Sequence, residues 1–217
     1  MRVVIAGGHG QIALLLAHQL AAAGDQPVSL IRNPEHVADV EQAGGWPVVF
    51  DLESGSAQQL SVHLAAADAV VFAAGAGPNS GAERKQTVDR DGAVLLAEAA
   101  RIAGVRRYVI VSALGTDDYD PDSDDVFQVY LRAKSEADAA LRATDLDWTV
   151  VRPGGLTDEE PTGRVTVATS TGRGQVPRAD VAAVVRACLT QPATIGHQFE
   201  LIGGETPIAD ALSALVG

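Results

Sequence analysis

Residues Val3–Gly24, VVIAGGHGQIALLLAHQLAAAG, decide the fold of this chain. An apolar run over Arg2–Ala6 leads directly into a glycine-rich turn, and the Ala- and Leu-rich stretch Gln11–Ala23 that follows is predicted to be a helix. This order of strand, tight turn and helix is typical of the first unit of a Rossmann-type sheet. The opening of the sequence therefore predicts an α/β fold.

The same alternation continues along the chain. Further strands are predicted over Pro27–Ile31, Pro47–Asp51, Ala69–Ala73, Arg107–Ser112 and Trp148–Arg152, and further helices over Glu35–Ala43, Ala57–Ala66, Glu83–Ala103 and Val126–Ala143. The strands are continuously apolar, as expected when helices cover both faces of a parallel sheet. We predict a doubly wound parallel sheet within a single domain, 1–217.

The pattern changes after Arg152. Pro153-Gly154-Gly155 breaks the chain, and beyond it the sequence predicts strands at Thr166–Thr169 and Gln198–Ile202 and a helix at Arg178–Leu189. This last third is too small for a core of its own. We therefore divide the chain into a dinucleotide-binding core, 1–152, and a small lobe, 153–217, that covers the carboxyl edge of the sheet and shapes a substrate pocket.

The turn after the first strand carries the pattern Gly7-x-x-Gly10-x-x-Ala13. Gly7 lets the chain leave the strand sharply, Gly10 lets the backbone approach a phosphate, and Ala13 lets the helix pack close to the sheet. The positive end of the helix dipole lies at the same point. The spacing predicts a dinucleotide site in which the pyrophosphate lies on Gly7, His9, Gly10, Gln11 and Ile12.

The end of the second strand indicates which dinucleotide is used. NAD sites carry Asp or Glu there for the ribose hydroxyls, whereas an Arg accommodates the 2′-phosphate of NADP. This strand ends Ile31-Arg32-Asn33, without an acid. We predict NADP(H) in preference to NAD(H), with a surface Arg as the alternative interpretation of Arg32.

Two more strand ends supply candidate cofactor contacts. Asp51 and Leu52 follow the third strand, where a carboxylate can accept a hydrogen bond from the adenine amino group or cap the next helix. Ala73, Ala74 and Gly75 end the fourth strand, and their small size would let the backbone lie against the adenosine ribose.

Tyr130 and Lys134 lie four residues apart in the predicted helix Val126–Ala143, so both side chains point from one face. A neighbouring ammonium stabilises a phenolate and lowers the pKa of a tyrosine. The same lysine could also bind the nicotinamide ribose. The pair is a candidate for proton transfer, and the alternative is that both side chains lie on the surface without a catalytic role.

These motifs resemble the short-chain dehydrogenase/reductase superfamily, in particular its atypical branch of flavin reductase/biliverdin reductase B-like and NmrA-like proteins. The resemblance rests on GGHGQIA, RRYVIVSALG, LDWTVVRPGGL and the last third, and spans nearly the whole chain. It implies that Ser112 polarises a substrate carbonyl, Tyr130 donates the proton, and Lys134 binds ribose. Pro153 and Gly154 would border the nicotinamide. Leu114 occupies the usual position of the catalytic Ser or Thr, so Ser112 could instead only cap its strand.

Composition argues against several other classes of function. The net charge is −12 and no run of Lys or Arg occurs, so neither nucleic acid nor a membrane surface is an expected partner. The single cysteine, Cys188, is predicted to be a packed thiol, and a cytoplasmic location is the default. The histidines lack metal-ligand spacing. Oligomeric state stays open between a monomer and a small homo-oligomer.

An acidic loop lies between Asp117 and Asp125, with six aspartates. It lacks the glycine turn and terminal Glu of an EF-hand, so we interpret it as a solvated lid or a rim of the active site rather than a calcium loop. Arg164, Arg173 and Arg178 in the last third could meet an anionic substrate or lie on the surface.

Three functions fit these residues. The first is an NADPH-dependent oxidoreductase that transfers a hydride to a flavin, quinone or carbonyl acceptor. The second is a non-catalytic NAD(P)(H)-binding redox sensor, which has little need of Tyr130 and Lys134. The third is a sugar-nucleotide epimerase, which the resemblance implies would carry a larger C-terminal domain.

Overall fold

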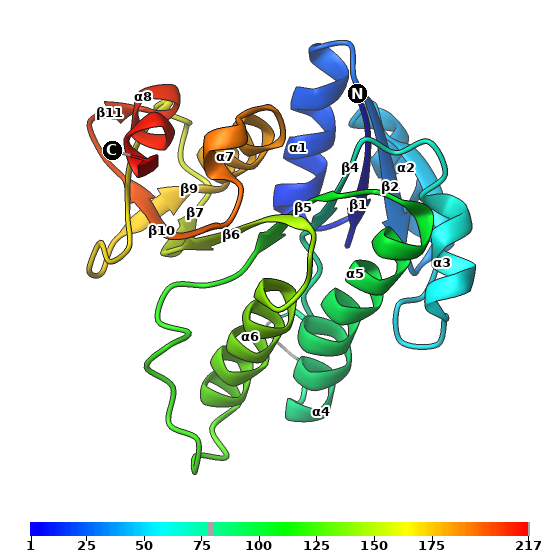
Figure 1. The fold of residues 1–217 in the computed structure, drawn as a ribbon, viewed down its shortest axis with the longest axis horizontal. Helices are drawn as coiled ribbons and strands as arrows, with labels where there is room; N and C mark the ends of the chain where they lie inside the picture. Colours follow the sequence, from blue (N-terminus) through cyan, green and yellow to red (C-terminus); the bar gives the residue numbers. More distant parts are fainter. Residues whose placement is uncertain (78–79, 217) are drawn as a thin grey trace.

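A nine-stranded sheet runs through the computed structural model, which describes residues 1–77 and 80–216 (Figure 1). The strands are β1 Arg2–Ala6, β2 Gln26–Ile31, β3 Trp46–Val49, β4 Ala69–Phe72, β5 Arg107–Val111, β6 Asp147–Pro153, β7 Gly155–Thr157, β8 Arg164–Ala168, β9 Gln175–Pro177, β10 His197–Gly203 and β11 Thr206–Pro207. The helices are α1 Gln11–Ala22, α2 Val37–Gln42, α3 Ala57–His63, α4 Ala82–Arg84, α5 Gly92–Ala103, α6 Val126–Arg142, α7 Arg178–Thr190 and α8 Ile208–Ser213.

The strand order across the sheet is β11-β8-β10-β6-β5-β4-β1-β2-β3. All neighbours from β10 to β3 are parallel, whereas β8 is antiparallel to β10 and β11 is antiparallel to β8. The predicted doubly wound sheet is therefore confirmed. From β1 the chain adds β2 and β3 on one side, and then returns to add β4, β5 and β6 on the other side. Ligands of such sheets bind at the carboxyl ends of the strands where this order reverses, here between β1 and β4.

Two apolar layers cover the sheet, because successive residues of a strand point to opposite faces. Val3 and Ile5 of β1 pack with α1 and α7, and Val4 and Ala6 pack with α3, α5 and α6. Figure 1 shows α1 and α7 on one side of the sheet and α5 and α6 on the other. The Ala-rich composition of these helices lets them approach the strands closely.

The predicted helix Glu83–Ala103 has nearly the expected bounds but is less regular than expected. It begins as α4, widens into a π-helical segment over Lys85–Asp91, and continues as α5 to Gly104, which takes the left-handed conformation that ends a helix. A π-helical turn is often found at a functional site. Lys85 and Asp89 lie in this segment and are both buried.

The last third of the chain extends the main sheet and adds a small second sheet and two helices. β10 adds to β6 in parallel, with Phe199 opposite Val151, and β8 and β11 complete the edge. β7 and β9 form a separate two-stranded sheet, and α7 packs on α1. Strand β8 begins two residues before the predicted strand, and β7, β9, β11 and α8 were not predicted.

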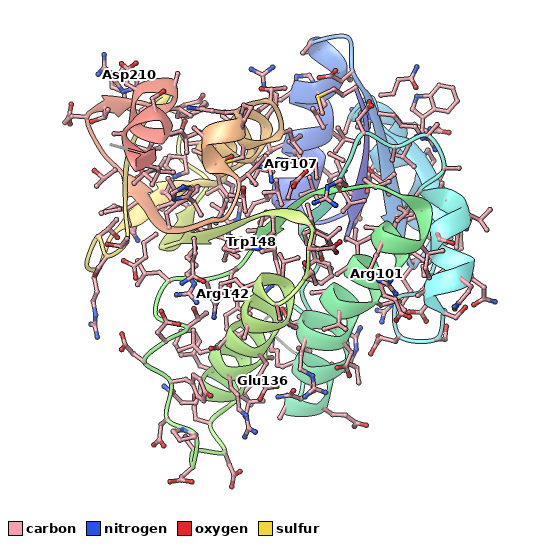
Figure 2. The ribbon with its side chains drawn as sticks, in the orientation of Figure 1. Arg101, Arg107, Glu136, Arg142, Trp148 and Asp210 are labelled. Carbon is pink, nitrogen blue, oxygen red and sulfur yellow. The ribbon has the colours of Figure 1, made fainter. Side chains whose placement is uncertain are left out.

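A partly buried arginine ties this last third to the centre of the sheet. Arg107 of β5 donates hydrogen bonds to the carbonyl of Cys188 in α7 at 2.7 Å and to the hydroxyls of Thr149 and Thr194 at 2.8 and 3.1 Å. Figure 2 labels Arg107 beneath α7. One side chain thus links β5, β6, α7 and the turn that precedes β10.

Candidate functional site

The glycine-rich turn after β1 leaves no room for side chains on its inner side. Gly7 has φ +78°, and a Cβ there would lie 2.4 Å from the Cα of Ala74. A Cβ on Gly8 would lie 2.4 Å from the Cβ of Ser29 in β2. The N–H of Gly10 donates to the carbonyl of Gly7 at 2.9 Å and closes the turn. The backbone therefore packs against β2 and β4 as only glycine allows.

The start of α1 is open to an anion. Gly10 is its N-cap residue and supplies no side-chain cap, and the first turn contains no acidic residue. The first N–H groups of a helix have no intrahelical partner and lie at the positive end of its dipole. The turn and the helix together have the donors and the close backbone that a pyrophosphate requires.

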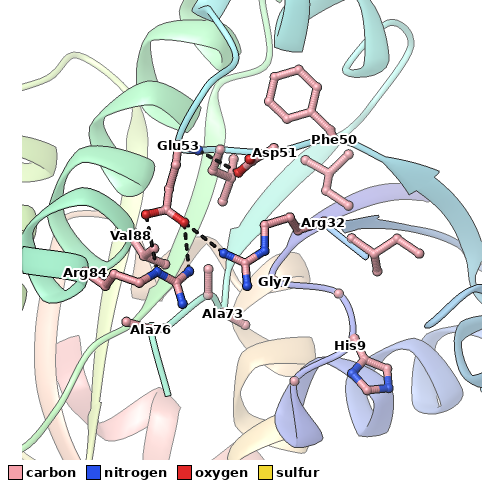
Figure 3. Close-up of a pocket in the computed structure, with 17 residues that line it drawn as sticks. Gly7, His9, Arg32, Phe50, Asp51, Glu53, Ala73, Ala76, Arg84 and Val88 are labelled. Carbon is pink, nitrogen blue, oxygen red and sulfur yellow. Dashed lines mark hydrogen bonds and ion pairs between the residues drawn. The ribbon is translucent and has the colours of Figure 1, made fainter. Parts of the chain in front are cut away.

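A cavity of about 260 Å³ lies against this turn (Figure 3). Of the predicted cofactor residues, it is lined by Gly7, His9, Gly10, Arg32, Asp51, Leu52, Ala73, Ala74 and Gly75. The His9 ring stacks on His36 with centroids 3.5 Å apart, and its Nε2 lies 2.7 Å from the Asp39 carboxylate. Residues from the ends of β1, β2, β3 and β4 therefore meet in one cavity, although they are far apart in the sequence.

Arg32 does not stand alone at the end of β2. Its guanidinium donates to Glu53 at 2.9 Å, and Arg84 of α4 donates to the same carboxylate oxygen at 2.7 Å (Figure 3). The hydrogen bond from Arg84 lowers the pKa of Glu53, so the carboxylate stays ionised. The second strand does end without an acid, as its sequence indicates, but Glu53 from the loop after β3 reaches its arginine.

A second cavity, of about 760 Å³, continues from the first. The two share the wall Ala73–Ala76 at the end of β4. The second cavity is lined by the predicted residues Ile12, Ser112, Tyr130, Lys134 and Pro153. A third cavity, of about 400 Å³, shares Ser112, Tyr130 and Pro153 with it and adds Gly154. The cleft thus runs from the glycine turn to the predicted Ser, Tyr and Lys.

Lys134 is buried in the wall of this cleft. Its ammonium donates to the carbonyls of Ala74 at 3.3 Å and Val111 at 3.2 Å, and lies 3.4 Å from Asp89 Oδ1. Asp89 in turn accepts a hydrogen bond from the N–H of Ala76 at 3.1 Å. Burial alone would lower the pKa of Lys134, but Tyr130 and Asp89 outweigh it, so the pKa lies above its ordinary value. The ammonium form persists at neutral pH.

Tyr130 lies beside two ammonium groups, yet its pKa is raised. The Nζ atoms of Lys85 and Lys134 lie 5.3 and 5.9 Å from the centre of its ring. Burial raises the pKa of Tyr130, and Lys134 only partly offsets this effect. The expectation that Lys134 lowers this pKa below its ordinary value is therefore not met. The hydroxyl keeps its proton at neutral pH.

Ser112 lines the cleft at the end of β5, but its hydroxyl donates to a buried carboxylate. The hydrogen bond to Asp138 Oδ2 is 2.8 Å long, and Arg152 Nε donates to the same oxygen at 3.0 Å. Arg152 also pairs with Asp117 through both terminal nitrogens, at 2.5 and 3.0 Å. With its proton directed at Asp138, the Ser112 oxygen presents a lone pair to a ligand.

Comparison with known proteins assigns the family. A model described as NAD(P)H-binding matches residues 7–192, which include the glycine turn and all three predicted catalytic residues. The chain belongs to the NAD(P)H-binding family. The predicted resemblance to NAD(P)H-binding proteins is thereby confirmed.

Three relatives of this NAD(P)H-binding chain cover almost its whole length. YhfK of Bacillus subtilis strain 168, named as an uncharacterised sugar epimerase, is 38% identical over 99% of this chain and 100% of its own. A Bacillus halodurans structure, named provisionally as an NAD-dependent epimerase/dehydratase, is 39% identical over 99% of each chain, with a TM-score of 0.91. The oxidoreductase ylbE of Lactococcus lactis is 28% identical over 100% of this chain and 97% of that chain, with a TM-score of 0.87.

Some residues of the cleft could not be found from motifs. Gln11, a predicted pyrophosphate contact, is exposed at the start of α1 and lines none of the three cavities. The cleft instead contains residues that the sequence did not indicate, namely Glu53, Arg84, Lys85, Asp89, Phe127 and Leu156. The signal available for Lys85 and Asp89 was their spacing of four residues within a helix, which resembles that of Tyr130 and Lys134.

The remaining candidates lie outside the cleft or on its rim. Cys188 is buried among apolar residues of α7, and burial raises the pKa of its thiol to about 12. Asp125 caps α6 by accepting from the N–H of Phe127 at 2.9 Å. Within residues 1–77 and 80–216, no three His, Cys, Asp or Glu side chains gather as metal ligands would. No helix in that part of the chain is long and apolar enough to cross a membrane.

Proposed function

We propose that this protein is an NADP(H)-dependent oxidoreductase that reduces a flavin, quinone or carbonyl compound. The observation that carries the proposal is the continuous cleft, in which the wall Ala73–Ala76 joins the glycine-turn cavity to the cavity of Ser112, Tyr130 and Lys134. A dinucleotide has two ends, and this cleft offers phosphate-binding groups at one part and proton-transfer groups at the other. The name of the oxidoreductase relative supports the same class of reaction.

The residues of the first cavity would hold the adenosine half. The Gly7–Gly10 turn and the start of α1 suit the pyrophosphate, and Asp51 and Leu52 suit the adenine. Arg32 and Arg84 would bind the 2′-phosphate, which competes with Glu53 for them. The exposed pair between Arg32 and Glu53 contributes only about 0.2–1 kcal/mol, so a phosphate dianion can replace the carboxylate at small cost.

The residues of the second cavity would orient the reacting half. When bound there, a nicotinamide cofactor supplies the hydride. Lys134, held by two backbone carbonyls and Asp89, is placed to bind the nicotinamide ribose, and Pro153 and Gly154 would border the ring. The lone pair of Ser112 suits a ligand N–H, such as that of a carboxamide.

Tyr130 would supply the proton for a carbonyl acceptor. Its raised pKa keeps the hydroxyl protonated, as a donor requires. The carbonyl carbon gains the hydride, the C–O π bond breaks, and the oxygen takes the Tyr130 proton, which solvent then replaces. A flavin or quinone needs the residue less, because water can protonate the reduced product.

Two other functions have specific observations in their favour. The engaged hydroxyl of Ser112 and the unactivated Tyr130 also suit a sensor that binds the cofactor without turnover. The names of YhfK and the Bacillus halodurans protein favour an epimerase. An epimerase returns the hydride to its own substrate and consumes no NADPH.

Oxidation of NADPH against a panel of FMN, riboflavin, quinones and small carbonyls tests the proposal. Absorbance follows turnover, and the fluorescence of NADPH follows binding, because neither Trp46 nor Trp148 lines the cleft. Acceptor-dependent oxidation supports the reductase, and its loss for carbonyls in Tyr130→Phe supports the proton donor. Binding without oxidation by any acceptor favours the sensor, and interconversion of sugar epimers without oxidation favours the epimerase.

A further inference from the structure

Lysine is rare in this protein, and both lysines lie in the same cavity. Only Lys85 and Lys134 are lysines, whereas the other 14 of the 16 basic residues are arginines. Both lysines are buried, with 6% and 3% of their surface exposed, and both line the cavity of about 760 Å³. Lysine side chains are normally exposed to solvent, so the burial of both lysines in one cleft indicates that they have a role there.

The two lysines differ in their partners. Lys134 lies 3.4 Å from Asp89, which balances its charge. The Lys85 ammonium donates to the carbonyl of Gly77 at 2.7 Å, and no carboxylate of the described residues lies within 4.0 Å of it. An ammonium has three donors, so Lys85 keeps two that no described protein atom accepts from.

The other charges of the cavity are already engaged. Arg178 pairs with Asp158 at 2.7 Å, and Asp125 caps the start of α6. Among the described residues that line this cavity, Lys85 is thus the cation without a carboxylate partner. A buried charge without a partner is costly, and burial lowers the pKa of Lys85 accordingly. A protein can retain this cost in free energy where a bound ligand supplies the missing negative charge.

The local structure directs Lys85 into the cleft. It begins the π-helical segment Lys85–Asp91, whose wider turn places Lys85 and Asp89 on the same side. Its Nζ lies 5.3 Å from the centre of the Tyr130 ring, next to the predicted proton donor. A ligand whose reactive group lies beside Tyr130 could therefore reach Lys85 with a second group.

We propose that Lys85 selects acceptors that carry an anionic oxygen group, a carboxylate, phosphate or sulfonate, close to the group that is reduced. This inference rests on the proposed function, since it names a property of the acceptor of that reaction. Lysine suits the role because it is a compact charge on a flexible stem, which can meet anions of different shapes. The bound anion would replace the missing carboxylate and restore neutrality at the ammonium.

Matched acceptor pairs test the inference. Each pair has the same reducible group with and without an anion: FMN and riboflavin, a naphthoquinone sulfonate and its parent quinone, and an aromatic aldehyde with and without a carboxylate. The dissociation constants of both members are measured on the protein saturated with NADP⁺, so turnover is not required. In the wild type, the anionic member of at least one pair should bind about ten- to a hundredfold more tightly.

The variants separate charge from packing. Lys85→Met should reduce the anionic-to-neutral ratio about tenfold or more, and Lys85→Arg should restore part of it. Replacement of an unpaired buried charge by an apolar residue of similar size should not unfold the protein, which its melting temperature verifies. Arg101→Met removes the same charge from an exposed site on α5 and should leave the ratio unchanged (Figure 2).

A second readout does not depend on affinity. Isotope-labelled lysine should give two side-chain NMR signals, and the one absent in Lys85→Met belongs to Lys85. The Lys85 signal should shift with FMN and much less with riboflavin. A wild type that prefers neither member of any pair, or a ratio unchanged in Lys85→Met, would overturn the inference, while acceptor-dependent oxidation of NADPH would still uphold the proposed function. Failure of the wild type to bind NADPH refutes the proposed function itself.

Discussion

Replacement of Arg32 by Gln should change cofactor preference rather than cofactor binding as such. Arg32 lies at the end of β2, 56% exposed at its side chain and paired with Glu53. A hydrogen bond to a charged group contributes about 1.5–3 kcal/mol, and release of Glu53 costs about 0.2–1 kcal/mol. The difference centres on about 1.5 kcal/mol, which corresponds to about a tenfold loss of NADP(H) affinity. NAD(H), which has no 2′-phosphate, should lose less than about threefold.

Titration of each cofactor by calorimetry measures this effect. Glu53→Gln should act in the opposite direction, because it frees Arg32 and Arg84 and removes the charge that repels the phosphate. The NADP(H) preference should also weaken as salt is added, since the contact is exposed. Arg101→Gln serves as the control for net charge. Equal losses for NAD(H) and NADP(H) in Arg32→Gln would refute the assignment of the 2′-phosphate to this end of the cleft.

Three other perturbations follow from the surroundings of Tyr130, Asp117 and Cys188. Tyr130→Phe should lower carbonyl reduction about a hundredfold or more and flavin reduction far less, and equal losses would argue against a proton donor. The hydrogen bond from Arg152 lowers the pKa of Asp117 below 3.8, so its stabilisation is present above that pH and is lost as pH falls through the folded-state pKa. Asp117→Asn should therefore lower the melting temperature at neutral pH, and the difference should disappear once acid protonates the Asp117 carboxylate, with Asp124→Asn as the control; a difference that persists in strong acid contradicts this origin. Cys188, whose pKa burial raises to about 12, should react with thiol reagents only after unfolding, and rapid labelling of the native protein would show an accessible thiol.

The first half of the fold could be predicted because local pattern and tertiary structure agree there. The run from β1 through Gly7 and Gly10 to α1 carries its own turn chemistry, and a continuously apolar strand has few alternatives in an α/β chain. The last third was harder, because Phe199 and its neighbours join the main sheet by a long connection that no local signal reveals. The π-helical segment also leaves no trace in hydrophobic periodicity.

The candidate site was predictable only where a motif fixes the spacing. Tyr130 and Lys134 share one helix, so their proximity follows from sequence. Glu53 lies in the loop after β3 and Arg84 in α4, so their meeting at Arg32 requires the folded chain. The direction of the Ser112 hydroxyl depends on Asp138 in another element, and the pKa of Tyr130 depends on a degree of burial that spacing cannot supply.

The packing of α7 on α1 bears on the order in which the chain is made. The apolar face of α1, including Leu16 and Leu20, leaves the ribosome long before α7, which covers it, has been synthesised. The hydrogen bonds from Arg107 to the carbonyl of Cys188 and the hydroxyl of Thr194 likewise form only after those two residues have been synthesised. A nascent chain of 152 residues would display this face to chaperones rather than fold around it. The first 152 residues are therefore expected to reach their final structure only once α7 has been translated.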